Sequence, residues 1–428
     1  MIKQTVFIFT LFLTLGVFIY TIRRLFFLLK ITQKAYPVND FGRRIIHTIK
    51  IAFFQTKILR KPLTGTLHAL VFWGFCVICI GSIEMVIDGC LNIENSLSIL
   101  GPVYNVLTAS NDIFGYLIAL LIVIFIIRRV VIKLKRFNGI EMTHKAHRDA
   151  NFSLILILTL MLSLVGMNLG YLGSTNENVG LYPISSLIIS PNSSLNPYYF
   201  HFIREVSWWI HILLVFFFAN YLPYSKHFHV FMSIPNVFLS RLEPLGKLPI
   251  MENVYKEVKL MMDPNLVFSE TSDNSAPSRF GIKDIEDISW KNFVDSLTCT
   301  QCGRCTAVCP ANITGKKLSP RKLFIDVRQR MNEKGNKIIK QGKDYSDNKS
   351  LINDYISTEE LWACTTCNAC ATECPVNINH PTLILDMRRY LVMEEAAGPA
   401  GLNAIFSNIE NNGAPWQYSS EDRLNWTL

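Results

Sequence analysis

Five long apolar runs alternate with polar connections in the first half of the chain. They cover approximately residues 5–29, 63–87, 112–132, 152–172 and 203–224. Each run is close to the roughly 20 apolar residues that a helix needs to cross the hydrocarbon core of a bilayer. The pattern therefore predicts five transmembrane helices, all of them before residue 225.

Lysine and arginine are distributed unevenly among the connections. Residues 23–62 carry ten of them and residues 128–148 carry seven, whereas residues 88–111 and 173–203 carry none. Basic connections remain on the cytoplasmic side of a membrane. We therefore expect the N-terminus outside, the C-terminus inside, and a bacterial cytoplasmic membrane as the location. A cleaved signal peptide is the alternative for the first run, but no small-residue cleavage site follows it.

The remaining sequence has a different pattern. Residues 38–59 have apolar positions at helical spacing among basic ones, which predicts an amphipathic helix on the inner membrane face. Residues 319–340 and 381–395 also have helical spacing, and no strand pattern is evident. We therefore predict an all-α protein in which a five-helix membrane domain precedes a helical ferredoxin domain. The predicted parts are a membrane domain at 1–235, a neck and linker at 236–289, a ferredoxin domain at 290–398 and a polar tail at 399–428.

Two matching cysteine runs lie in the predicted soluble domain. The spacing C-x-x-C-x-x-C-x-x-x-C-P occurs twice, at Cys299, Cys302, Cys305 and Cys309 and again at Cys364, Cys367, Cys370 and Cys374. Three thiolates at this spacing can hold one corner of a cuboidal cluster, and in two-cluster ferredoxins the fourth cysteine binds the other cluster. We therefore assign Cys374 to the first cluster and Cys309 to the second, and expect two [4Fe–4S] clusters.

Zinc sites and disulfide bonds are the alternatives for these cysteines. Structural zinc takes four ligands, commonly as paired C-x-x-C units. That pattern does not explain a third cysteine at the same spacing followed by Cys-Pro, and both features occur in each run. Disulfides are rare in the cytoplasm, where the expected topology puts this domain. The chain's formal net charge of +9 could suggest a nucleic-acid partner, but the basic residues flank the apolar runs, so we expect no nucleic acid.

Histidines inside the apolar runs are candidate haem ligands. Ionisable residues within a membrane usually have a function. His68 lies near the cytoplasmic end of the second run, and His229 and His227 lie at the inner end of the fifth. Two histidines at equal depth on facing helices can hold a b-type haem. His211 lies eighteen residues before His229, about 27 Å away at helical rise, too far to share one haem with it.

The membrane half resembles the gamma subunit of respiratory nitrate reductase, a five-span di-haem protein that oxidises quinol. The matching residues are His211-Ile-Leu-Leu, Leu222-Pro-Tyr-Ser-Lys226, His229 and Ser233-Ile-Pro235, with Leu67-His68 on the second span. The resemblance implies haem ligation by His68 and His229. The position of the family's other ligand on the second span is Ile78, so a second haem at His211 would need a different partner.

The soluble half resembles heterodisulfide-reductase-related iron–sulfur oxidoreductases that are fused to such membrane domains. The matching segments are Trp290-Lys291, both cysteine runs, Leu318-Ser-Pro-Arg321, Trp362-Ala-Cys364, Arg388-Arg389 and Asn412-Gly-Ala-Pro-Trp416. In the fused relatives a cysteine-rich catalytic region follows the last of these. The resemblance therefore implies a separate cysteine-rich iron–sulfur partner.

Together these features predict a membrane electron-transfer oxidoreductase of a respiratory chain. Electrons would pass between a soluble donor, two clusters, haem b and menaquinone or ubiquinone, and the resemblance suggests an electron-transfer flavoprotein as donor. One alternative is a quinol-driven disulfide or heterodisulfide reductase component. The other is a non-redox membrane scaffold or sensor with structural clusters.

Overall fold

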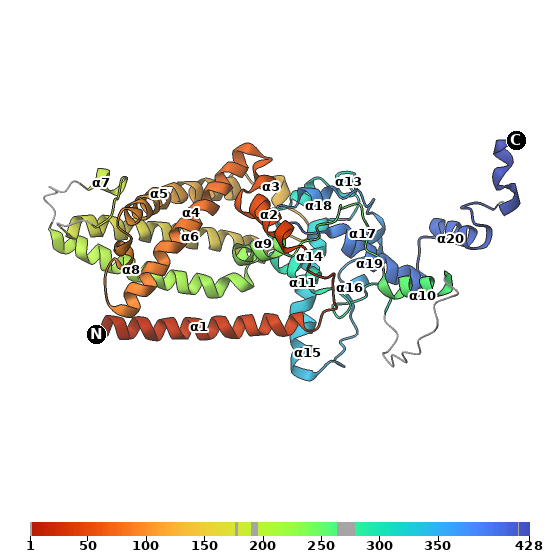
Figure 1. Ribbon diagram of the computed structural model, residues 1–428, viewed down its shortest axis with the longest axis horizontal. Helices are drawn as coiled ribbons and strands as arrows, with labels where there is room; N and C mark the ends of the chain where they lie inside the picture. The colour runs from red at the N-terminus through yellow and green to blue at the C-terminus, as the bar shows by residue number, and fades with distance from the viewer. Residues whose placement is uncertain (1, 176–178, 190–195, 263–278, 418) are drawn as a thin grey trace.

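The computed structural model describes residues 2–428 apart from 176–178, 190–195, 263–278 and 418. The molecule is elongated: long helices lie side by side at one end, and a group of short helices lies at the other (Figure 1). The described residues form no strands, only two isolated bridges, Gln33–Ser289 and Ile352–Ile356. The predicted all-α class is therefore confirmed.

Five helices are long and apolar enough to cross a membrane. They are α1 (Ile2–Leu29), α4 (Pro62–Leu91), α5 (Pro102–Val130), α6 (His144–Ser174) and α8 (Pro197–Tyr221). The five apolar runs form five long helices, as predicted, although α5 begins at Pro102 rather than near residue 112. Proline favours the first helical turn because it has no N–H to leave unpaired there, so α5 starts before its apolar residues do.

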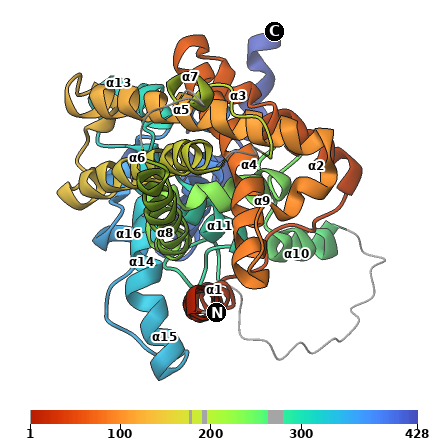
Figure 2. The same cartoon turned by 90° about the vertical axis from the view of Figure 1, so that its left-hand side faces the viewer.

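Small residues let the long helices approach one another closely. A Cβ atom at Gly170 of α6 would lie 2.6 Å from the backbone nitrogen of Arg204 in α8, and one at Gly166 would lie 2.4 Å from Ser207 Oγ. Such spacing of small residues allows two backbones to pack in a membrane. Viewed from the end of the bundle, α1 lies at its margin, where it contacts α4 and α8 (Figure 2).

The predicted amphipathic helix over 38–59 is wrong as a single element. The segment forms α2 (Phe41–Thr48), a π-helical turn (Ile49–Phe53) and α3 (Thr56–Leu59). Gln55 breaks the helix because it adopts the left-handed conformation, with φ 54°. The break turns α3 back against the start of α4, where a Cβ atom at Gly65 would lie 2.2 Å from the Ile58 carbonyl oxygen.

The second part of the molecule is built from short helices. The longer ones are α11 (Trp290–Thr298), α14 (Pro320–Arg330), α15 (Asn336–Gln341) and α19 (His380–Met393), and a π-helical turn (Met331–Gly335) joins α14 to α15. The shorter ones are α12 (Arg304–Ala307), α13 (Pro310–Ile313), α16 (Leu351–Asp354), α17 (Thr358–Trp362) and α18 (Ala369–Glu373). The predicted helices over 319–340 and 381–395 are confirmed, and Leu323, Phe324, Val327 and Met331 are fully buried.

One hydrophobic core continues across the junction between the two parts. Leu28 at the end of α1 belongs to the same buried cluster as Phe324 of α14. Ile285 and Ile288 are also fully buried in it, although the sequence assigns them to the linker. The earlier part of that predicted linker, residues 263–278, lies outside the described residues. Because the core is shared, the part that carries the cysteines packs directly against the ends of the long helices.

The neck and the tail complete the chain. After α8, two single 3₁₀ turns, Leu222–Tyr224 and Lys226–Phe228, lead to α9 (His229–Phe238) and then α10 (Glu252–Met262). The C-terminal segment forms α20 (Ala400–Asn412) and a 3₁₀ helix (Ser420–Thr427), which extend away from the rest of the molecule (Figure 1).

Candidate redox-cofactor sites

The first group of cysteines combines both sequence runs. Cys299 follows α11, Cys302 precedes α12 and Cys305 lies in its first turn. All three line one small cleft together with Cys374, which follows α18. Cys299, Cys305 and Cys374 are buried. The structure thus brings the last cysteine of the second run to the first three of the first run.

The second group is formed in the reciprocal way. Cys370 interacts electrostatically with Cys364, Cys309 and Cys367, so the last cysteine of the first run lies with the first three of the second. Cys309 and Cys370 are buried, and Cys367 is exposed. Each run's last cysteine therefore lies with the first three cysteines of the other run.

The two cysteine loops repeat the same backbone conformation. Gln301 and Gly303 in the first loop have φ of 54° and 72°, and the corresponding Thr366 and Asn368 in the second have φ of 51° and 60°. Positive φ is strained for most residues other than glycine, so its recurrence at two such positions indicates a functional constraint. These turns let the backbone curl around a central group, and the Thr366 N–H donates to Cys364 Sγ over 3.3 Å.

The chemistry of the cysteines fits iron–sulfur clusters better than zinc. Structural zinc commonly takes paired C-x-x-C units, whereas each group here joins three cysteines of one run to the last cysteine of the other. A [4Fe–4S] cluster binds four thiolates, one at each iron, which matches the four cysteines of each group. Burial raises the pKa of the Cys299 thiol to about 11 and that of Cys374 to about 12. Metal binding is what would hold such buried sulfurs as thiolates.

Polar residues quoted for the family resemblance support the cysteine loops. Arg388 of α19 donates to the carbonyl oxygens of Leu361 and Cys364 over 2.6 and 2.5 Å, which fixes the start of the second loop. Lys291 of α11 donates to Asn236, whose amide donates over 2.8 Å to the carbonyl oxygen of Val376, just after Cys374. The motifs marked these residues in the sequence, but only the fold shows what they hold.

The first cysteine group lies against the membrane part of the chain. Lys57 of α3 donates to the carbonyl oxygen of Cys374 over 3.1 Å, and Arg304, next to Cys305, donates to the carbonyl oxygen of Lys57 over 3.4 Å. Arg304 also interacts electrostatically with His68 of α4. The inner end of α4 is therefore the part of the bundle that lies next to this group.

His68 and His229 are near neighbours at this inner end. The two rings interact electrostatically, although they come from α4 and from the start of α9. The Nδ1 of His229 lies 3.1 Å from the carbonyl oxygen of Lys226, so its Nε2 is left for a ligand. The Nδ1 of His68 is buried without a hydrogen-bond partner among the described residues. Two buried imidazoles, one with its Nδ1 anchored and its Nε2 free, fit a group that binds imidazole.

His211 lies apart from that pair. It is on α8, whereas His229 follows two 3₁₀ turns and begins α9, so the two histidines do not share one straight helix as the sequence suggested. His211 is 1% exposed and its Nδ1 contacts Ser163 and the carbonyl oxygen of Leu160 on α6. It lines a cavity at the end of the bundle remote from the cysteines, together with Ile78. Among the described residues that line this cavity, it is the only histidine.

Comparisons with known proteins agree with the cysteine chemistry. A family described as "4Fe-4S dicluster domain" matches residues 298–378. That range contains all eight cysteines of the two groups, which supports two [4Fe–4S] clusters.

The whole chain is similar to larger iron–sulfur proteins. It is 31% identical to a probable iron-sulfur-binding oxidoreductase, FadF, of Bacillus subtilis, over 96% of this chain and 58% of the relative. It is 27% identical to an EtfAB:quinone oxidoreductase of Syntrophomonas wolfei, over 91% of this chain and 54% of the relative. The chain thus spans little more than half the length of these curated relatives.

A third relative matches the soluble part only. It is one component of the dihydromethanophenazine:CoB–CoM heterodisulfide reductase of Methanosarcina mazei, and it is 30% identical over 33% of this chain and 35% of the relative. No solved structure matches. The chain is therefore similar to proteins named as iron–sulfur oxidoreductases, and it combines a 4Fe–4S dicluster domain with five apolar helices of membrane-spanning length.

Proposed function

We propose that this protein is a membrane electron-transfer subunit that links a soluble donor to the quinone pool. Electrons would pass through two [4Fe–4S] clusters and one b-type haem. The observation that carries the proposal is the contact between the first cysteine loop and the bundle: Arg304 of that loop donates to the carbonyl oxygen of Lys57 in α3 and interacts electrostatically with His68. A cluster and a haem at these positions would be neighbours, with no intervening domain.

The proposed haem would be held by His68 and His229. Their proximity and the anchored Nδ1 of His229 support this assignment. The resemblance of the membrane part to the nitrate reductase gamma subunit supports it independently. When bound, a b-type haem supplies one-electron chemistry, and the chain contributes its axial ligands and buried surroundings.

The two clusters would act in a fixed order. The cluster at Cys299, Cys302, Cys305 and Cys374 contacts α3 and lies beside the proposed haem site. The other group includes Cys367, which is exposed to solvent. We assign the first cluster to exchange with the haem and the second to exchange with a soluble partner.

The partner and direction are proposed from the relatives. One relative is named an EtfAB:quinone oxidoreductase, which supports an electron-transfer flavoprotein as donor and menaquinone or ubiquinone as acceptor. The match to a component of a heterodisulfide reductase favours the second candidate function, in which quinol drives reduction of a disulfide on a separate cysteine-rich partner. A scaffold or sensor with structural clusters would not need His68 and His229 where the long helices meet the cluster part.

We place the clusters on the cytoplasmic side of a bacterial inner membrane, with the N-terminus outside. The connections at the cluster end of the bundle carry ten and seven basic residues, and the opposite connections carry none. Basic residues of these connections, such as Lys57, then lie on the cytoplasmic side, as the positive-inside rule predicts.

Optical and electron paramagnetic resonance spectra of the purified protein test the proposal. Reduced-minus-oxidised spectra should show one b-type haem per chain beside two [4Fe–4S] signals. Adding an oxidised short-chain quinone to the reduced protein should reoxidise both kinds of centre. Clusters without haem absorbance, or reduced centres that quinone does not reoxidise, would contradict it.

A further inference from the structure

Arg328 of α14 lies between the first cysteine group and the segment that leads to His229. Its guanidinium donates to the carbonyl oxygens of Pro223 and Ser225 over 3.1 and 3.0 Å. It also interacts electrostatically with Cys299, the first cysteine of that group. One cation therefore contacts the turns between α8 and α9 and at the same time faces a proposed cluster ligand.

The positive charge of Arg328 is not neutralised by an ion pair in the described part of the chain. An acidic residue that it faces is Asp149 of α6, but that carboxylate accepts the hydroxyl of Tyr221 and the N–H of Lys226. Carbonyl oxygens carry no net charge, so they orient the guanidinium without cancelling its charge, and an arginine stays protonated in a protein. Arg328 therefore keeps a full positive charge beside Cys299.

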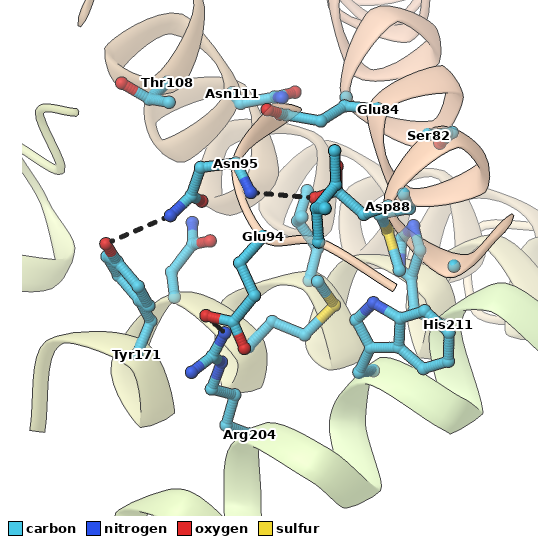
Figure 3. A pocket seen from close by; sticks show the side chains of 18 of the residues that line it. Ser82, Glu84, Asp88, Glu94, Asn95, Thr108, Asn111, Tyr171, Arg204 and His211 are labelled. Atoms are coloured by element: carbon cyan, nitrogen blue, oxygen red, sulfur yellow. Dashed lines mark hydrogen bonds and ion pairs between the residues drawn. The ribbon is translucent and has the colours of Figure 1, made fainter. Parts of the chain in front are cut away.

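Two further cations face the same group and form no ion pair with the described residues. Lys57 donates to the carbonyl oxygen of Cys374 over 3.1 Å, and Arg304 lines the cleft that the four cysteines share. The opposite end of the bundle differs, because Arg204 pairs there with Glu94 over 2.7 Å (Figure 3). The first cysteine group thus faces several cations whose charge no paired carboxylate offsets.

The second cysteine group has a different environment. Arg388 faces it, since its guanidinium donates to the carbonyl oxygen of Cys364 and interacts electrostatically with that cysteine. Cys367 of this group is exposed, so water and salt screen the charges around it. The same positive charge acts more strongly in the buried surroundings of the first group, because Coulomb energies rise as the dielectric constant falls.

Positive charge near a redox centre favours its reduced state. Reduction adds one electron to a [4Fe–4S] cluster, and the charge around the cluster is one of the factors that set its reduction potential. Burial alone acts in the opposite direction, because a medium of low dielectric constant disfavours added charge. The same medium strengthens the attraction of a nearby cation, so unneutralised cations beside a buried cluster reverse that effect.

We propose that the charge of Arg328 raises the reduction potential of the first cluster above that of the second. The proposal rests on the membrane electron-transfer function above and gives that function a direction. One electron leaves the reduced second cluster and reduces the first, and no bond forms or breaks and no proton moves. Electrons from a soluble donor then pass downhill toward the membrane, whereas quinol-driven reduction of a disulfide has to cross this step uphill.

A potentiometric titration of the full chain in detergent, followed by electron paramagnetic resonance, tests the proposal. The signal that disappears in Cys309→Ser identifies the second cluster, and the first should have the higher midpoint potential. Arg328→Gln keeps a donor for the Ser225 carbonyl oxygen but removes the charge. It should lower the equilibrium constant for electron transfer from the second cluster to the first about tenfold, which corresponds to about 59 mV for one electron.

Two further variants separate charge from position. Arg328→Lys keeps the charge and can still donate to a carbonyl oxygen, so the potential of the first cluster should stay close to that of the unaltered protein. Lys340→Gln is the matched control, because it removes an exposed charge on α15, and neither potential should change. An unchanged first potential in Arg328→Gln, or equal falls in the glutamine and lysine variants, would overturn the proposal.

Cluster and haem contents of the same samples distinguish this proposal from the proposed function. Both contents should equal those of the unaltered protein in the Arg328 and Lys340 variants, which also shows that these variants fold. A first cluster with the lower potential would overturn the inward direction, while quinone-dependent reoxidation of the centres would leave the proposed function standing. Protein without haem would contradict the proposed function, yet its two cluster potentials would still decide the role of Arg328.

Discussion

Arg321 and Glu141 form a fully buried ion pair between the two parts of the molecule. The Nε of Arg321 lies 2.7 Å from Oε1 of Glu141, and the two side chains are 1% and 2% exposed. Glu141 belongs to the connection between α5 and α6, whereas Arg321 is in the first turn of α14. The guanidinium also donates to the carbonyl oxygens of Arg136 and Asn138, so it fastens this connection to the helix beside the first cysteine group.

Removal of one partner should loosen that attachment. Glu141→Ala would leave a buried guanidinium charge unpaired, which destabilises a protein by about 3–5 kcal/mol. The midpoint of thermal bleaching of cluster absorbance should therefore fall markedly. Electron transfer from the clusters to the haem, followed by stopped-flow absorbance, should slow even in protein that keeps all its iron.

A surface pair provides the control for this prediction. Lys317 and Glu359 are 68% and 60% exposed, and such pairs contribute about 0–1 kcal/mol. Glu359→Ala should leave both measurements close to those of the unchanged protein. Equal effects of the Glu141 and Glu359 substitutions would show that the buried pair does not hold the two parts together.

The crossed cysteine groups make a prediction about which cluster each cysteine supports. Cys309→Ser should damage the cluster at Cys364, Cys367 and Cys370 more than the one next to it in sequence. The reason is that Cys309 lies in the electrostatic neighbourhood of Cys370. Iron content and electron paramagnetic resonance of the variant would measure it, with Cys374→Ser as the reciprocal control. Selective loss of the cluster at Cys299, Cys302 and Cys305 in the Cys309 variant would refute the crossed assignment.

The proposed haem makes a prediction about two histidines. His68→Ala and His229→Ala should each abolish b-type absorbance, because either change leaves an open iron position in a buried site. The cluster signals should persist, donor-to-cluster transfer should continue, and quinone reduction should stop. His227→Ala is the control: its ring centroid lies 5.8 Å from that of His229, but its Nδ1 contacts Ser225, and the haem should be retained. Normal haem in the His229 variant would show that the histidines are paired wrongly.

The proposed orientation can be tested by labelling. A cysteine introduced near Ser174 should react with a membrane-impermeant thiol reagent in intact cells. One introduced at Lys133, in the basic connection between α5 and α6, should be protected until the cells are opened. Background reaction of Cys76, exposed on α4, is measured in the unaltered protein. The reverse pattern of protection would move the clusters to the outside.

Much of the architecture follows from one-dimensional patterns. Five helices could be predicted because a membrane span requires a long uninterrupted apolar run, and such a run is visible without any knowledge of neighbours. The helix over 319–340 was predictable because Leu323, Phe324 and Val327 recur on one face. The break at Gln55 was not predictable, because apolar spacing continues through it and the left-handed turn depends on contacts with α4.

Eight cysteines at cluster spacing, five long apolar runs and their charge asymmetry can all be read from the order of residues alone. These are properties of composition and spacing, so they do not depend on how distant segments meet. The folded chain is needed to see that Arg304 interacts electrostatically with His68, that Glu141 pairs with Arg321, and that His211 and Asn111 line one cavity. Those contacts join residues remote in sequence, and they arise because a shared core around Leu28 and Phe324 fixes the soluble helices against the ends of the long ones.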